Sequence, residues 1–196
     1  LIAKGIKTLI ICPHDGGAAA AAVEAAKAEG INVISYDRLI TDTEAVDYYV
    51  TFDSIAVGEA QAQYLVDNAT GTGHPLYLYA GAASDNNAFL FFEGAWNVLQ
   101  PKIADGTFVI KNSSEAIALQ DKATLTRDEM GKIIGQITTN WDFNEAKNKA
   151  EQTTIIKEYL VLLTMYPRLK RIYRYISAKK EAGKLPPSID RNQILE

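Results

Sequence analysis

Three groups of residues in this chain have side chains suited to binding chemistry. Asp37 and Arg38 are adjacent, so carboxylate acceptors and a guanidinium donor fork stand in one place. Asn86 and Asn87 form a pair, and a side-chain amide can bind a hydroxyl through both its carbonyl and its amino group. Trp141 stands in a polar run, where the face of its ring could stack on an apolar surface of a ligand.

This mixture of acceptors, donors and an aromatic face suits the recognition of a neutral polyol such as a sugar. Each hydroxyl of a polyol both donates and accepts a hydrogen bond, so a site needs both kinds of partner. Each group also has a simpler interpretation. The Asp37–Arg38 pair would then be an ion pair at a loop edge, the asparagines would cap a helix, and Trp141 would anchor the core. The residues alone leave these alternatives open.

The sequence contains no recognisable catalytic constellation. It has no Gly-x-Ser-x-Gly motif, no P-loop and no Rossmann glycine triplet, and neither His14 nor His74 has a partner at ligand-like spacing. The single Cys12 excludes an internal disulfide and a cysteine-cluster metal site, and its position inside the apolar run 8–12 predicts a buried, inert thiol. We therefore predict no catalytic residues, no metal and no cofactor.

The segments that position these residues alternate between strand and helix patterns. Short apolar runs predict strands at 8–12, 32–36, 48–52, 76–79 and 108–110, and helix-forming segments follow at 18–29, 54–68 and 86–102. This alternation predicts an α/β fold with parallel sheets built from right-handed crossovers. Ligands of such sheets bind outside the carboxyl ends of the strands, where Asp37, Arg38 and the asparagine pair stand. The Thr126–Glu129 spacing fits a capping box, which either opens a short helix or decorates a loop.

Composition and charge divide the chain near residue 150. The 196 residues are 47% apolar and 22% charged, as in globular proteins, and no apolar run reaches the length of a membrane-spanning helix. Residues 1–150 carry 11 Lys and Arg against 19 Asp and Glu, whereas residues 151–196 carry 9 against 5. The later segment has apolar residues at helical spacing, interrupted by Pro167, and predicts a basic helical hairpin.

Residues 1–146 resemble the type I periplasmic sugar-binding proteins of ABC transporters, in particular the D-xylose-binding and multiple-sugar-binding subgroup. The resemblance rests on the stretches at 3–16 (AKGIKTLIICPHDG), 33–40 (VISYDRLI), 48–53 (YYVTFD), 84–88 (SDNNA) and 140–142 (NWD). It implies two Rossmann-like lobes that close on an aldose. It also implies that Asp37 and Arg38 bind sugar hydroxyls, that Asn86 or Asn87 is a ligand, and that Trp141 is a stacking platform.

The resemblance also suggests a division of the chain. We expect residues 1–73 to be part of the first lobe and residues 74–143 part of the second. Residues 144–196 do not match the family, and we interpret them as a fused or partner-derived helical hairpin. The opening strand–helix unit of the family and the later strands of both lobes have no counterpart here, so each lobe is expected to be partial.

These observations lead to three functional hypotheses. The first is binding of an aldose such as D-xylose outside the cytoplasm, for ABC-type uptake or for sensing, with an ABC permease or a membrane sensor kinase as partner and no nucleic acid. The second is a two-component signalling complex that associates through the tail, whose pattern is similar to the helical extracytoplasmic part of LytS-type histidine kinases. The third is the effector domain of a sugar-responsive transcription regulator.

Overall fold

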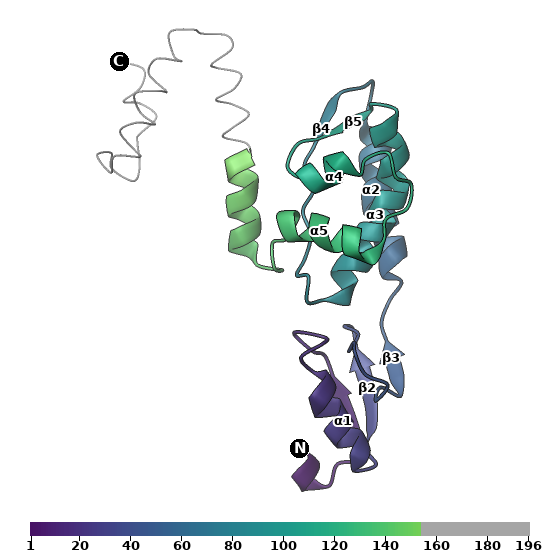
Figure 1. The fold of residues 1–196 in the computed structure, drawn as a ribbon, viewed down its shortest axis with the longest axis vertical. Coiled ribbons are helices and arrows are strands. Elements are labelled where there is room, and N and C mark those ends of the chain that lie inside the picture. The colour runs from purple at the N-terminus through teal and green to yellow at the C-terminus, as the bar shows by residue number, and fades with distance from the viewer. Residues whose placement is uncertain (154–196) are drawn as a thin grey trace, which may run out of the picture. The chain divides into compact units, whose positions relative to one another are not determined.

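The structure is a computed structural model that describes residues 1–153 (Figure 1). Residues 1–146 form one compact unit, and the chain from residue 147 onward belongs to another. Residues 143–153 are helical. The predicted hairpin lies outside the described residues from residue 154 onward. Among the described residues, no helix combines the length and the apolar character that crossing a bilayer requires.

The first sheet holds three parallel strands in the order β1 (Thr8–Ile11), β2 (Asn32–Tyr36) and β3 (Tyr48–Val50), preceded by a short 3-10 turn, η1 (Ile2–Lys4). Helix α1 (Ala20–Ala28) connects β1 to β2 and packs on one face of this sheet (Figure 1). Strand residues and helix residues close a small apolar core there, formed by Val23, Ala26, Ile31, Val33, Ile40 and Ala45.

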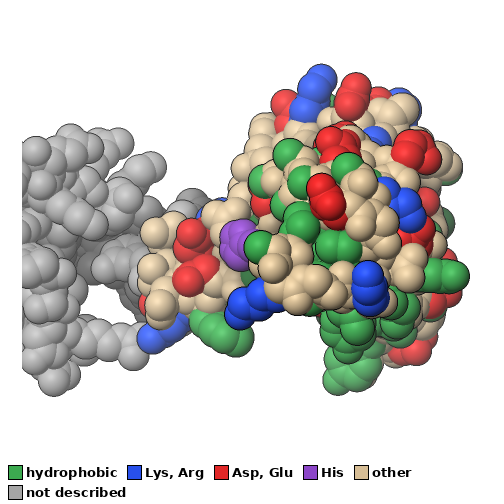
Figure 2. Space-filling view, turned by 90° about the horizontal axis from the view of Figure 1, so that it is seen from below, with side chains coloured by type: hydrophobic (Ala, Val, Ile, Leu, Met, Phe, Trp, Pro, Cys, Tyr) green, Lys and Arg blue, Asp and Glu red, His purple; other side chains and the backbone are tan. Residues whose placement is uncertain are grey.

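The opposite face of the first sheet is exposed in the part of the chain that the structure describes. The register aligns Ile10 with Ile34 and Tyr48, and Tyr36 with Val50. Ile10 and Tyr48 are each 66% exposed, although parallel strands are normally covered on both faces. Figure 2 shows apolar side chains gathered at the surface of the described region.

The second sheet pairs β4 (His74–Leu76) with β5 (Phe108–Ile110) in parallel, and an isolated parallel bridge joins Ala80 to Thr138. Within the described residues, four helices share a core with this sheet: α2 (Ser54–Asn68), α3 (Asn86–Ala104), α4 (Ser114–Ala118) and α5 (Arg127–Ile137). They share one larger core, to which α3 and α5 contribute the most side chains, among them Phe92, Trp96, Leu99, Ile133, Ile134 and Ile137. The predicted α/β class with parallel sheets is therefore confirmed.

Helix α2 packs closely along α3, and two glycines make this approach possible. A Cβ atom on Gly58 would lie 2.1 Å from the carbonyl oxygen of Phe91, and one on Gly94 would lie 2.1 Å from the carbonyl oxygen of Ile55. We expected α2 in the first lobe because it precedes residue 73. Its packing against α3 brings it into the larger core, and the division of the chain at residue 73 stays a prediction.

Local signals predicted the helix starts well. The Asp53 side chain accepts a hydrogen bond from the Ala56 backbone N–H at 3.0 Å and caps α2, which begins where the helix was predicted. The Thr126–Glu129 capping box is complete and opens α5. The prediction that Cys12 is buried is wrong. Cys12 follows the last residue of β1 and is exposed at the carboxyl edge of the sheet, where its Sγ lies 3.9 Å from Asp37 Oδ2.

Candidate functional site

Asp37 immediately follows β2, at the carboxyl edge of the first sheet. Its φ of 64° lies in the left-handed region, which non-glycine residues adopt at a cost, Asp and Asn less unwillingly than others. The backbone N–H of Asp37 donates to the Val50 carbonyl at 2.8 Å. Its carboxylate contacts Cys12 at one oxygen and Asn87 Nδ2, 3.4 Å away, at the other. Neither contact is short, so the carboxylate keeps capacity to accept further hydrogen bonds.

Arg38 reaches from the first sheet to the start of α3. Its Nε lies 3.1 Å from Asp85 Oδ2, and its Nη1 donates to the His14 carbonyl at 3.0 Å. The structure therefore pairs Arg38 with Asp85 and not with the adjacent Asp37. This geometry contradicts a simple loop-edge pair between neighbours and leaves other guanidinium N–H groups for a ligand.

Asn87 joins the same region from the first turn of α3. Its amide nitrogen donates to the Asp37 carbonyl at 3.1 Å, and its amide oxygen lies 3.4 Å from both Tyr49 Oη and Ser54 Oγ. Asn87 is only 4% exposed. Asn86 is the first residue of α3 and half-buried, and its side chain makes no hydrogen bond within the described residues. Of the pair, Asn87 is therefore the member that the structure joins to Asp37.

Trp141 is held by an unusual backbone turn after the Ala80–Thr138 bridge. Asn140 and Trp141 have φ values of 52° and 58°, and positive φ is rare for a residue as bulky as tryptophan. The indole Nε1–H donates to Asp85 Oδ2 at 3.0 Å, and the ring packs against Gly81. Trp141 nevertheless stays 42% exposed, which makes it a surface ring rather than a core anchor.

Two further aromatic rings continue from Trp141. The Phe91 ring meets Trp141 edge-on, with ring centres 6.1 Å apart, and stacks on Phe52 at 6.0 Å. Phe52 follows β3 of the first sheet, whereas Phe91 belongs to α3, which packs with the second sheet. The three rings therefore connect segments from both parts of the fold. They give the site an apolar side next to its polar groups.

Asp85 is the residue that sequence reasoning missed. We named only the two asparagines that follow Asp85 as candidates, with helix capping as the alternative, and it is Asp85 that caps α3 by accepting the Asn87 backbone N–H at 2.9 Å. Its other oxygen accepts hydrogen bonds from both Arg38 and Trp141, and the residue is only 3% exposed. Its place next to the asparagine pair was the available signal.

The structure thus brings Asp37, Arg38, Asn87 and Trp141 together around Asp85. Their side chains present carboxylate and guanidinium groups beside an exposed indole face. Such a set can accept from hydroxyls, donate to them and cover a C–H surface, and it contains no nucleophile–base pair. The arrangement suits binding of a polyhydroxylated ligand.

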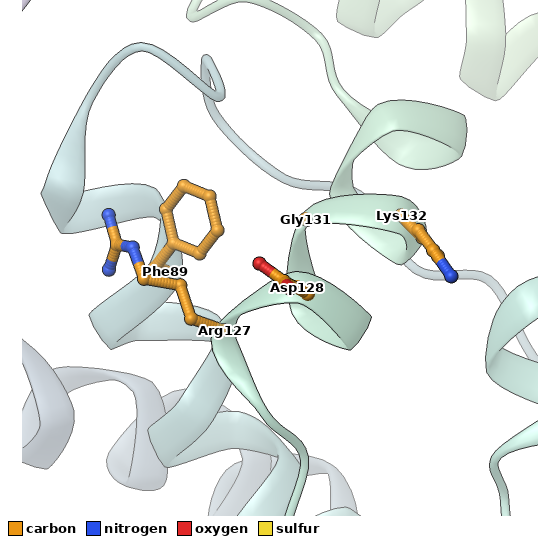
Figure 3. A pocket seen from close by; sticks show the side chains of 5 residues that line it. All are labelled: Phe89, Arg127, Asp128, Gly131 and Lys132. Carbon is orange, nitrogen blue, oxygen red and sulfur yellow. The ribbon is translucent and has the colours of Figure 1, made fainter.

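A separate surface hollow lies on the second core, away from these residues. Phe89, Arg127, Asp128, Gly131 and Lys132 line it, and the Arg127 guanidinium carbon lies 4.0 Å from the centre of the Phe89 ring (Figure 3). Figure 3 shows Lys132 pointing away from Arg127, so the two cations do not converge. None of the predicted binding residues lines this hollow, and we do not assign the site to it.

Several known proteins that resemble this chain are sugar-binding proteins. The periplasmic binding protein domain family matches residues 1–155. The multiple sugar-binding periplasmic receptor ChvE of Rhizobium radiobacter is 40% identical over 121 residues, which cover 60% of this chain and 34% of that protein. The D-xylose-binding periplasmic protein of Escherichia coli strain K12 is 41% identical over 106 residues, covering 54% and 31%.

A solved structure is more similar still. The carbohydrate transporter solute binding protein of Chloroflexus aurantiacus, in complex with D-glucose, is 81% identical with a TM-score of 0.77, and the match covers 79% of this chain and 46% of that one. This chain therefore spans less than half the length of each of these three proteins. The predicted resemblance is confirmed, and the family that matches is one of solute-binding proteins rather than of enzymes.

Proposed function

Because the chain belongs to the periplasmic binding protein family, we propose that it binds a monosaccharide at the residues gathered around Asp85. The observation that carries this proposal is the convergence of Asp37, Arg38, Asn87 and Trp141, which come from three separate segments of the chain. Their side chains supply the donors, acceptors and ring face that a sugar requires.

Each residue has a distinct part in the proposed complex. The Asp37 carboxylate accepts hydrogen bonds from sugar hydroxyls, and the remaining N–H groups of Arg38 donate to them. The exposed indole of Trp141 covers the C–H face of the ring. Asp85 keeps the Arg38 guanidinium and the indole in place, and it neutralises a cation that would otherwise be costly to desolvate when the ligand covers it.

Relatives suggest which sugars to try first. D-Glucose is bound in the 81% identical structure from Chloroflexus aurantiacus, and the Escherichia coli relative is named as a D-xylose-binding protein. We propose an aldose of this kind as ligand, a location outside the cytoplasm and an ABC permease as partner. The periplasmic relatives support the location, and the transporter relatives support the partner.

Calorimetric titration of the full chain tests the proposal. D-Glucose, D-xylose, D-galactose and D-ribose are titrated in turn, and we expect saturable binding of at least one. Asp37→Ala and Trp141→Ala should each weaken that binding at least tenfold, which corresponds to about 1.4 kcal/mol.

A matched aromatic variant provides the control. Phe143 lies two residues after Trp141 and is 92% exposed, so Phe143→Ala should bind the sugar as the unchanged chain does. Absence of heat with all four sugars would overturn the proposal for this chain. Binding that survives both Asp37→Ala and Trp141→Ala would place the ligand elsewhere.

A further inference from the structure

The carbonyl oxygen of Asp37 is surrounded by three side-chain donors. The hydroxyls of Tyr49 and Thr51 and the amide nitrogen of Asn87 each lie 3.1 Å from it. Tyr49 belongs to β3, Thr51 follows that strand, and Asn87 comes from α3. A carbonyl oxygen has two lone pairs, so it can accept from two of these three donors at a time.

This concentration of donors falls on a strained position. Asp37 has the left-handed φ of 64°, and such conformations persist where the surroundings over-determine them. The Asp37 backbone N–H is already fixed by the Val50 carbonyl on β3. The hydroxyls of Tyr49 and Thr51 therefore bond the peptide group that follows Asp37, whereas the Val50 carbonyl bonds the peptide group that precedes it.

We propose that Tyr49 and Thr51 are positioning residues of the sugar site. Their hydroxyls hold the Asp37 backbone in the left-handed conformation, and this turns the carboxylate toward the ligand. The inference rests on the proposed function of Asp37 and adds residues that touch no sugar. Tyr49 has a second contact, since its hydroxyl also lies 3.4 Å from Asn87 Oδ1 and so orients the amide that binds Asp37.

Variants that remove only a hydroxyl test this inference. In the full chain, Tyr49→Phe and Thr51→Val should each raise the dissociation constant of the sugar at least threefold, and the two together about tenfold. Tyr48→Phe is the matched control, because Tyr48 is 66% exposed on the opposite face of β3 and its hydroxyl makes no hydrogen bond within the described residues. Unchanged affinity in the double variant would overturn the inference.

A double-mutant cycle with Asp37→Asn separates positioning from general loss of structure. Asparagine tolerates the left-handed conformation and keeps the shape of the side chain, but it replaces the charged carboxylate by an amide with a single acceptor oxygen, so Asp37→Asn removes the carboxylate without releasing the turn. If Tyr49 and Thr51 act through Asp37, their substitution should add less than a twofold loss once Asp37 is Asn. Equal losses in both backgrounds would contradict the inference, because independent effects add.

A measurement without sugar keeps this inference distinct from the proposed function. Amide hydrogen exchange at Asp37 should be at least tenfold faster in the Tyr49→Phe/Thr51→Val variant than in the unchanged chain and in Tyr48→Phe. If the exchange rate changes in this way but the unchanged chain binds no sugar, the proposed function is refuted. The conclusion that the two hydroxyls fix the Asp37 backbone then still stands. If the unchanged chain binds sugar but the exchange rate at Asp37 is the same in all variants, the positioning role of Tyr49 and Thr51 is refuted and the proposed function is not.

Discussion

Asp85 is a buried carboxylate that holds two residues of the candidate site, Arg38 and Trp141. One of its oxygens caps α3, and the other accepts from both the Arg38 guanidinium and the Trp141 indole. A buried charge is costly unless it is paired and fully hydrogen-bonded, and here both conditions are met. The cap is a local feature, and the other two partners are 47 and 56 residues away in the sequence.

Gly81 gives Trp141 the space it needs. A Cβ atom on Gly81 would lie 2.0 Å from Cζ2 of the indole, so Gly81→Ala must displace the ring. We expect this variant to weaken sugar binding at least tenfold, about 1.4 kcal/mol, and to shift the tryptophan fluorescence, because Trp141 loses its bond to Asp85. Calorimetry and emission spectra provide the measurement.

Gly131→Ala is the control for this prediction. A Cβ atom there would meet only Phe89 Cε1 at 3.8 Å, an ordinary contact, so sugar binding should not change. If Gly81→Ala bound sugar as well as Gly131→Ala does, the position of the indole would be irrelevant to the site.

At the scale of elements, the close contact between α2 and α3 is the packing that attaches α2 to the second core. Gly94→Ala would bring a Cβ atom within 2.1 Å of the Ile55 carbonyl oxygen, and backbone cannot move aside as a side chain can. We expect the free energy of unfolding to fall by about 2 kcal/mol, a typical cost of overpacking. Urea denaturation measures it.

The matched control lies on α5. Gly135 has nothing within 4 Å of its Cβ position, so Gly135→Ala should stabilise the chain by up to about 1 kcal/mol through helix propensity. A Gly94→Ala variant that is as stable as Gly135→Ala would show that the two helices are not in close contact.

The Asp47 carboxylate ties α1 to the first sheet and makes this contact dependent on pH. The hydrogen bond from Lys27, and then that from the Val33 backbone N–H, lower the pKa of Asp47 below its usual 3.8. Its stabilising contribution is therefore present at neutral pH and is lost as pH falls through the lowered pKa. Asp47→Asn should reduce the melting temperature near pH 7, and this difference should shrink toward zero as the pH falls below 3.8.

Asp121→Asn is the control, since the Asp121 side chain makes no hydrogen bond within the described residues. Its melting temperature should follow that of the unchanged chain at every pH. An Asp47→Asn difference that stays constant between neutral and acid pH would contradict the ionic role of Asp47.

The sequence predicted elements better than it predicted their partners. The Asp53 cap and the Thr126 capping box are local patterns of a few residues, and both helices begin where those patterns place them. The partner of α2 depends on Gly58 and Gly94 meeting across 36 residues, which no short pattern reveals. The burial of Cys12 was predicted wrongly because the apolar run 8–12 includes it, whereas β1 ends at Ile11 and leaves the thiol exposed.

At the scale of the whole molecule, both cores contribute to the candidate site. Asp37 and Arg38 follow a strand of the first sheet, whereas Asn87 and Trp141 belong to segments that pack with the second. A ligand held by both sets adds contacts between them that the ligand-free chain lacks. Sugar binding should therefore depend on residues far apart in the sequence and not on one continuous motif.

The two tryptophans of the chain allow the most direct test of this account. Trp141 lies in the candidate site, whereas Trp96 is buried in the second core, where its indole donates to the Lys122 carbonyl at 2.9 Å. We propose recording nitrogen–proton correlation spectra of the full chain during titration with D-glucose and D-xylose. The indole signal of Trp141 and the Nε–H signal of Arg38 should shift together with one dissociation constant, while that of Trp96 stays in place. A titration in which Trp141 and Arg38 do not respond would contradict the central claim that these residues form a sugar site.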